Sequence, residues 1–286
     1  MSRLRTAALA VKLHDPASLA LARAIAEWLE GHGARVFSLR PEDQPPLPVA
    51  TDLALSVGGD GSVISVARRL AGQGIPLAGI NTGRVGFLTE FTASTWQEGL
   101  AMALNQGWQV EKRLGISLQV TRAGKEVFSL LAVNEVVISR GGFARLPAFE
   151  LEAGASRLIS LRADGIIIAS PTGATAYSSS SGGPLLYPTL QAYSVTAICP
   201  FQTRFPPLVL EAATELRITL RESDSETFAT VDGQEFFPLQ KGDRLTLRGR
   251  PEAILLARFG LTDYFSKLRS TGFIADSPGT GRLSAC

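Results

Sequence analysis

The first part of the chain alternates short apolar runs with segments whose apolar residues recur at helical spacing. The apolar runs are expected to be buried strands, and they cover residues 7–13, 34–39, 53–57 and 75–81. Helices are expected in the segments between and after them, at residues 16–33, 63–71 and 94–107. This order predicts a parallel sheet covered by helices, because adjacent parallel strands are joined by right-handed crossovers.

The pattern changes from about residue 110 to residue 259. Apolar and polar residues alternate there, or form short apolar runs, as in GISLQVTR, AFELEAG and DRLTLRG. Such segments are typical of antiparallel strands. The sequence therefore predicts an α/β protein with an N-terminal parallel-sheet α/β domain, residues 1–110, followed by a mostly antiparallel, β-sandwich-like domain, residues 111–261. A short amphipathic helix at 263–273 is expected within a tail, residues 262–286, that docks back on the first domain.

Composition narrows the classes of function. The chain has 286 residues, of which 45% are hydrophobic and 19% charged, as expected for a globular protein with a sizeable core. Its formal charge of +2 is small, and its arginines are too scattered to form the basic stripe of a nucleic-acid-binding protein. Its apolar runs are far shorter than the roughly 20 residues that cross a bilayer, and Lys12 interrupts the N-terminal one. A cytoplasmic protein with no nucleic-acid or membrane partner is expected.

Few residues are suited to metal or redox chemistry. The two cysteines, Cys199 and Cys286, imply no disulfide framework and no cysteine zinc site. The two histidines, His14 and His32, make a histidine-based triad or a multi-histidine metal site hard to build. Acid–base chemistry is therefore expected to use carboxylates.

The segment GGDG, residues 58–61, joins an expected strand to an expected helix. One interpretation is a structural turn, because Asp-Gly is a common turn signal. The other is a phosphate site at the carboxyl edge of the sheet, where glycines and a helix N-terminus let phosphate approach backbone N–H groups. A carboxylate repels phosphate, so Asp60 fits this second interpretation as a metal partner or as the base for an attacking hydroxyl.

Two further stretches place polar residues in unusual surroundings. Asn134 and Glu135 interrupt the apolar run LLAVNEVVIS, either at a water-facing edge or bulge or as a pair that binds sugar hydroxyls. The segment DGIIIASPTGATAYSSSSGGP forms either a capped short helix packed through small residues or a nucleotide pocket. In such a pocket, small side chains would admit a flat base, and hydroxyls would contact ribose or phosphate. The residues alone leave both pairs of alternatives open.

Four segments, in their order along the chain, resemble the signature segments of the NAD kinase family. They are GGDGS, NTGRVGFL, NEVV and DGIIIASPTGATAYSSSSGGP. The likeness covers about residues 6–273; GGDG is shared with lipid kinases, whereas the long segment together with Asn-Glu is highly specific. The resemblance implies an active site between the two domains, completed in a homodimer or homotetramer. It implies a kinase that transfers the γ-phosphoryl group of ATP, or of polyphosphate, to the 2′-hydroxyl of the adenosine ribose of NAD, with a divalent cation, Mg²⁺.

The resemblance also implies roles for individual residues. Asp60 would be the general base, with Gly61 beside the dinucleotide. Asn134 and Glu135 would contact ribose or adenine groups. At the nicotinamide-ribose and phosphate end, the contacts would be Arg145, Arg162 and Asp164, from the same or a neighbouring subunit. On the adenine side they would be Thr175, Ala176, Tyr177, Ser178, Ser179 and Ser180. Gln234 in VDGQ would be a further contact, although Asp-Gly in this segment also predicts a hairpin turn. No protein ligand of the metal ion is identified.

The chain departs from the family pattern at three positions. Ser62 stands where threonine is usual, Ala174 where serine is common, and Pro206 where an arginine is usual. In the family pattern this arginine would make a subunit or phosphate contact, which is expected here only if Arg204 replaces it. Two other functions are compatible with parts of the sequence. A lipid kinase of the Gly-Gly-Asp-Gly type would need an apolar cleft or membrane face, and a non-catalytic dinucleotide sensor would bind without phosphoryl transfer.

Overall fold

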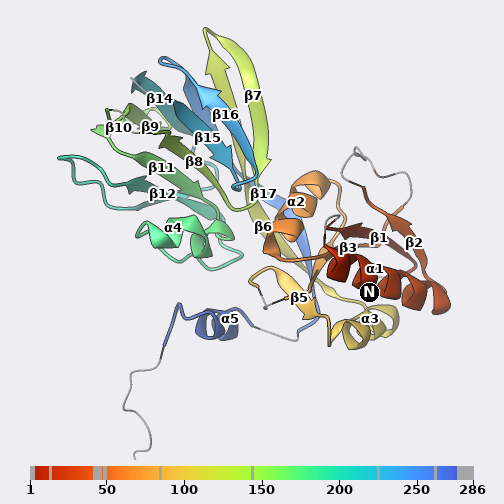
Figure 1. Cartoon of the computed structure of the whole chain (residues 1–286). Helices are drawn as coiled ribbons and strands as arrows, with labels where there is room; N and C mark the ends of the chain where they lie inside the picture. Colours follow the sequence, from red (N-terminus) through yellow and green to blue (C-terminus); the bar gives the residue numbers. More distant parts are fainter. Residues whose placement is uncertain are drawn as a thin grey trace, which may run out of the picture.

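Two regions of different architecture make up the structure, with a C-terminal helix between them (Figure 1). The computed structural model describes residues 4–12, 15–40, 47, 50–83, 86–142, 145–223, 226–260 and 263–275. The helices are α1 (Pro16–Gly31), α2 (Asp60–Leu70), α3 (Trp96–Asn105), α4 (Tyr177–Ser180) and α5 (Tyr264–Ser270), with the short 3-10 helix η1 (Gly173–Thr175). Over the described part of the chain, no helix has the length and apolar character needed to cross a membrane.

The N-terminal region contains the predicted parallel sheet. Its strands follow the order β2 (Arg35–Ser38), β1 (Thr6–Val11), β3 (Leu53–Val57), β4 (Leu77–Asn81) and β5 (Thr89–Thr92). Alternate side chains point to opposite faces, so Ala7 and Leu9 pack with α1 and α3 whereas Ala8 and Ala10 pack with α2. The sequence did not predict β5, because this short strand, TEFT, has Phe91 as its one large apolar residue.

The C-terminal region is the predicted antiparallel sandwich. One sheet has the order β13 (Leu208–Glu211), β12 (Ala192–Ile198), β11 (Gly165–Ala169), β8 (Glu135–Arg140), β15 (Thr227–Val231) and β16 (Glu235–Leu239). It packs on the antiparallel part of the larger sheet, which consists of β6 (Gln109–Arg122), β7 (Lys125–Ala132), β9 (Ala148–Ala153), β10 (Ser156–Arg162), β14 (Leu216–Glu222) and β17 (Arg244–Arg258). A shared apolar core lies between the sheets, with Ile138, Ile166 and Tyr193 from one and Ile218 and Leu247 from the other.

The strand β17 connects the two regions. Its first half pairs with β14 and β6 in the sandwich, and Leu256 near its end pairs in parallel with Leu77 of β4. The larger sheet therefore runs through both regions, and β17 returns the chain to the parallel sheet just before α5. The division into domains at residue 110 remains a prediction, and residues 262 and 276–286 of the predicted tail lie outside the described residues.

One boundary prediction was wrong in a way that matters for the site. The second helix begins at Asp60 and not at Val63. Gly59 is its N-cap in an extended conformation, and Asp60 lies in the first turn, where the helix dipole favours a negative charge. Periodicity detects a helix only from its first apolar residue, so it missed this turn.

Candidate active site

Asp60 lies at the carboxyl edge of the parallel sheet, directly after β3. Its Oδ2 accepts a hydrogen bond from the Phe87 N–H at 2.8 Å, and its Oδ1 accepts one from the Leu88 N–H at 3.1 Å. A carboxylate offers about four lone-pair positions, so these bonds leave capacity for another donor. Phe87 and Leu88 thus hold Asp60 in one orientation without saturating it. Residues 86–89, the last of which begins β5, are here called the 86–89 loop.

Gly86 explains why this loop fits around the carboxylate. A Cβ atom at Gly86 would lie 2.2 Å from Asp60 Oδ1 and 2.4 Å from Asp60 Cγ, so any side chain would displace one of the two. The segment NTGRVGFL therefore has a steric role at its second glycine. Arg84 and Val85 of the same segment lie outside the described residues.

Asn134 and Glu135 lie at the start of β8, against the turn that follows β11. A Cβ atom at Gly173 would lie 2.2 Å from the Asn134 carbonyl oxygen and 2.8 Å from Glu135 Oε2. The turn is also tied to the pair through Ser170, whose N–H donates to the Asn134 carbonyl at 2.8 Å and whose Oγ donates to the Val133 carbonyl at 2.6 Å. The structure thereby brings the Asn-Glu pair next to the predicted adenine-side segment.

The Asn-Glu pair presents unpaired acceptors. Glu135 is 7% exposed, so it does not occupy a water-facing edge or bulge. Its Oε2 and Asn134 Oδ1 are buried without a hydrogen-bond partner among the described residues. Burial raises the pKa of Glu135 to about 7, the nearby Asp232 carboxylate adds to the effect, and the Tyr177 backbone N–H opposes it. These oxygens suit a ligand that donates hydrogen bonds, such as the hydroxyls of a sugar.

The hydroxyl-rich segment forms η1 and the short helix α4. Ser179 Oγ donates to the Ala176 carbonyl at 2.8 Å, and Thr175 Oγ1 donates to the Thr172 carbonyl at 3.4 Å. Ser178 Oγ is buried with no hydrogen-bond partner in the described part of the chain, and α4 has no side-chain cap. The expected short helix is therefore present, but it is uncapped and lies beside the unpaired acceptors. Tyr177 and Ser180 are its exposed residues.

The turn between β15 and β16 gives Asp232 a role that the sequence did not reveal. Asp232 and Gly233 have φ angles of 54° and 64°, as a hairpin turn with Asp-Gly requires. The Asp232 carboxylate accepts the backbone N–H groups of three consecutive residues, Val133, Asn134 and Glu135. It thereby shapes the backbone at the start of β8.

The same turn also contacts α2. Asp232 forms an ion pair with Arg68 of α2 at 3.5 Å. Gln234 Nε2 donates to the Gly61 carbonyl at 2.8 Å, and Arg68 Nη2 donates to Gln234 Oε1 at 3.1 Å. Gly61 and Gln234 were predicted separately and lie in direct contact. A continuous series of contacts therefore links the turn of Asp60 to the Asn-Glu pair across the junction of the two regions.

Arg145, Arg162 and Asp164 lie elsewhere in the same chain. Asp164 precedes β11, whose opposite end pairs with Glu135. At a rise of about 3.4 Å per residue, the length of these paired strands places Asp164 about 15–20 Å from Glu135. Asp164 accepts a hydrogen bond from Arg140 Nε at 2.7 Å, Arg162 pairs with Glu222, and Arg145 is exposed before β9. The structure does not bring these three residues to Asp60 within one chain.

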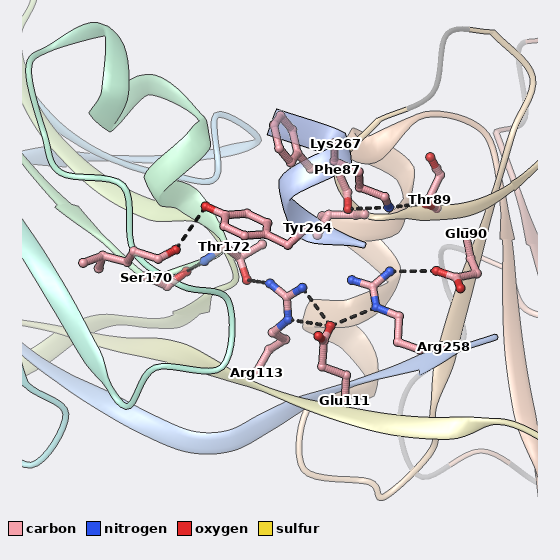
Figure 2. A network of polar contacts seen from close by, with 12 residues as sticks. Phe87, Thr89, Glu90, Glu111, Arg113, Ser170, Thr172, Arg258, Tyr264 and Lys267 are labelled. Carbon is pink, nitrogen blue, oxygen red and sulfur yellow. Dashed lines mark hydrogen bonds and ion pairs between the residues drawn. The ribbon is translucent and has the colours of Figure 1, made fainter. Parts of the chain in front are cut away.

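A partly buried ionic network connects Thr172, in the turn after β11, with Glu90 of β5 (Figure 2). Glu111 Oε1 accepts hydrogen bonds from Arg113 Nε at 2.9 Å and from Arg258 Nε at 2.8 Å. Arg258 Nη1 donates to Glu90 Oε2 at 2.9 Å, and Arg113 Nη1 donates to Thr172 Oγ1 at 3.3 Å. Burial raises the pKa of Glu111, but the two guanidinium groups outweigh it, so the pKa lies below its ordinary value. Sequence reasoning missed this network, because its members come from three separate strands and one turn and form no local pattern.

Comparison with known proteins identifies the family. Models of the ATP-NAD kinase N-terminal and C-terminal domains match residues 44–108 and 133–259. The NAD kinase of Nitratidesulfovibrio vulgaris strain DP4 is 44% identical over 280 residues, which cover 96% of this chain and 94% of the relative. The chain belongs to the NAD kinase family. Another relative, the NAD kinase of Geobacter sulfurreducens, is 36% identical over 280 residues, 93% of this chain and 98% of its own length.

Solved structures agree with the NAD kinase fold. A yeast NADH kinase complexed with NADH superposes with a TM-score of 0.83 at 20% identity, over 100% of this chain and 91% of its own. An Archaeoglobus fulgidus NAD kinase in complex with ATP gives 0.73 at 25% identity, over 93% and 99% of the two chains. Because the family match includes the C-terminal half, the lipid-kinase alternative is not supported.

Two departures from the NAD kinase pattern can be placed in the structure. Ala174 is fully buried, and its N–H donates to the Ser170 carbonyl at 3.0 Å, so the turn closes through the backbone without a serine hydroxyl. Pro206 and Arg204 are both exposed. A contact made by Arg204 in place of the usual arginine would therefore lie at the surface of the chain and not in the interior of the site.

Proposed function

We propose that the protein is an NAD kinase that phosphorylates the 2′-hydroxyl of the adenosine ribose of NAD, with Asp60 as the general base. The observation that carries this proposal is the convergence of the Asp60 turn and the Asn-Glu pair through Gln234 and Asp232. A fixed carboxylate and a set of unpaired acceptors are thereby presented at one junction. Phosphorylation of a sugar hydroxyl uses a base for the proton and groups that position the sugar, and these residues are suited to the two roles.

The chemistry follows from the charges that develop. The ribose 2′-oxygen forms a bond to the γ-phosphorus, and the bond from that phosphorus to the β,γ-bridging oxygen breaks, so that ADP leaves. The proton of the hydroxyl passes to the Asp60 carboxylate. Because Asp60 keeps free lone pairs beside its two N–H partners, it can accept this proton without releasing the 86–89 loop. The N-terminus of α2 adds a positive electrostatic potential where phosphate charge develops.

A divalent cation, Mg²⁺, belongs to the proposal. Among the described residues no group of three or more histidine, cysteine, aspartate or glutamate side chains could hold a metal ion. A single carboxylate, Asp60, fits an ion held mainly by donor phosphates and water, as Mg²⁺ commonly is. The ion would neutralise charge on the phosphate oxygens.

The Asn-Glu pair and the hydroxyl-rich segment are proposed to bind the acceptor. Asn134 Oδ1 and Glu135 Oε2 would accept hydrogen bonds from ribose or adenine groups, which would give these buried oxygens the partners they lack among the described residues. Thr175 to Ser180 would form the adenine-side pocket, with Gly61 and Gln234 at its edge.

Arg145, Arg162 and Asp164 are proposed to act at the nicotinamide end of the site of a neighbouring subunit. Their distance from the Asn-Glu pair within one chain supports this arrangement. A homodimer or homotetramer would then be the active form. The use of polyphosphate beside ATP and a cytoplasmic location remain predictions.

The substitution Asp60→Asn tests the base. General-base catalysis raises the rate by about 10²–10⁴-fold, so kcat for NADP formation from NAD, ATP and Mg²⁺ should fall by a factor of about that size. Asparagine can accept only one of the two N–H bonds, so a stability loss of about 1–3 kcal/mol is also expected. Binding of NAD, measured by calorimetry, should persist.

A matched control separates chemistry from stability. The Asp52 carboxylate also accepts two backbone N–H groups, those of Arg5 and Thr6, each at 2.9 Å. Asp52→Ala should lower the melting temperature comparably and leave kcat unchanged. Near-normal NADP formation by Asp60→Asn would contradict the role of base. A wild-type protein that binds NAD and forms no NADP would instead be a dinucleotide sensor.

A further inference from the structure

Lys267 is a buried lysine on α5, with 5% of its surface exposed. Its Nζ donates hydrogen bonds to the Phe87 carbonyl at 3.0 Å and to the Thr89 carbonyl at 2.8 Å (Figure 2). Both carbonyls belong to the 86–89 loop, which also holds Asp60. An ammonium group loses hydration when it is buried, so this arrangement has a free-energy cost that two carbonyl contacts offset only in part.

One peptide group lies between Lys267 and Asp60. The Phe87 carbonyl and the Leu88 N–H are the two ends of the same peptide. Lys267 binds its oxygen at 3.0 Å, and Asp60 Oδ1 binds its N–H at 3.1 Å. The peptide dipole is therefore aligned between a cation and a carboxylate, and hydrogen bonds arranged in such a chain strengthen one another.

The helix that carries Lys267 is held from both regions of the molecule. The Tyr264 hydroxyl donates to the Leu186 carbonyl at 3.3 Å, and its ring packs edge-on against Tyr187 with centroids 5.6 Å apart. The Phe273 ring, just after α5, packs edge-on against Phe87 at 5.5 Å. Contacts on both sides fix the position from which Lys267 reaches the loop.

We propose that Lys267 is a positioning residue for phosphoryl transfer: its ammonium anchors the 86–89 loop, and the loop orients the Asp60 carboxylate. The inference rests on the proposed function, because it gives Asp60 the role of base. It adds a residue from the far end of the chain to the machinery. Lys267 itself touches neither the substrate nor the Asp60 side chain.

The charges around Lys267 make the anchor sensitive to pH. Four charged groups face it, namely Arg258 of β17, Glu90 of β5, Asp60 of α2 and Arg113 of β6. The pKa of Lys267 is lowered to about 8: burial is the largest cause, the two arginines also lower the pKa, and the two carboxylates partly oppose the shift. The ammonium is therefore lost in mildly alkaline solution, whereas an ordinary lysine keeps its charge to about pH 10.

The test compares Lys267→Met with Arg269→Met. Methionine keeps an unbranched apolar side chain in place of the lysine stem, and Arg269 is an exposed cation on the same helix. Because misplacement by about 1 Å can cost about 100-fold, kcat of Lys267→Met should fall by about 10–100-fold. The KM values for NAD and ATP should change by less than about twofold, since binding contacts remain. Arg269→Met should match the wild type.

Two further measurements decide whether the effect is positional. The wild-type kcat should decline as the pH rises through about 8, and Lys267→Met should show no such decline. Hydrogen exchange at the Phe87 and Leu88 amides should be faster in Lys267→Met than in Arg269→Met. Slow turnover with unchanged exchange, or a wild-type profile that is flat up to pH 10, would overturn the inference. Exchange requires no turnover, so its result stays interpretable even if the wild type forms no NADP.

Discussion

Glu135→Gln should stabilise the folded protein at pH 8 while weakening its affinity for NAD. Glu135 is buried, and its Oε2 has no hydrogen-bond partner among the described residues. Above neutral pH the side chain must carry a charge in this environment, next to the Asp232 carboxylate. Glutamine removes the charge and keeps the shape, so the folded state should gain what the charge costs.

The pKa of Glu135 gives the magnitude. It rises from 4.5 to about 7, so the folded state binds more protons than the unfolded state between these values. The free energy of unfolding therefore falls as the pH rises through this window, and the loss is complete above about pH 7. At about 1.4 kcal/mol per pKa unit, the charge costs up to about 3 kcal/mol. A buried amide also needs partners, so a net gain of about 1–3 kcal/mol is expected at pH 8 and almost none at pH 4.5.

Urea denaturation at several pH values measures this difference. Glu111→Gln is the matched control, because the pKa of Glu111 lies below its ordinary value: burial raises it, and Arg113 and Arg258 more than offset the rise. Its charge stabilises the fold above pH 4.5, so Glu111→Gln should be less stable than the wild type at pH 8. Calorimetry of Glu135→Gln should show NAD binding weaker by about 1.5–3 kcal/mol. The reasoning fails if Glu135→Gln has the wild-type dependence of stability on pH.

Three further substitutions test individual contacts. Gly86→Ala places a Cβ 2.2 Å from Asp60 Oδ1, so kcat should fall by about 100-fold and the melting temperature should fall at least as much as in Asp60→Asn; normal turnover would show that the loop can move without disturbing Asp60. Asp232→Ala breaks a buried ion pair with Arg68 and leaves three N–H groups without their acceptor, which should cost about 3–5 kcal/mol in urea denaturation, and a cost below about 1 kcal/mol would refute this. Arg162→Ala should lower the activity of the assembled oligomer, and the wild type should lose activity on dilution; a fully active monomer in light scattering would disprove a contribution between subunits.

The order of the elements and the family follow from the amino-acid sequence without the structure. Apolar runs of five to seven residues, separated by segments of helical periodicity, indicate a parallel sheet, and alternation indicates the antiparallel sandwich, because each pattern reflects which faces of an element are buried. The motif residues around Asp60 and Glu135 were recognisable because their chemistry is unusual in apolar surroundings. The sequence failed at the first turn of α2 and at β5, where few apolar residues carry a periodic signal.

The contacts that support the motif residues depend on how distant segments fold together. Lys267 contacts Phe87 across 180 positions, and Asp232 binds the Glu135 N–H across 97 positions. Such contacts depend on the paths of β17 and of the β15–β16 hairpin, and no local pattern encodes them. The burial of Glu135 is likewise a property of the packed turn at Gly173, because the same carboxylate on an open edge would be hydrated and have an ordinary pKa. The chemistry of each side chain is thus written in the sequence, whereas its charge state and orientation are set by distant parts of the chain that fold against it.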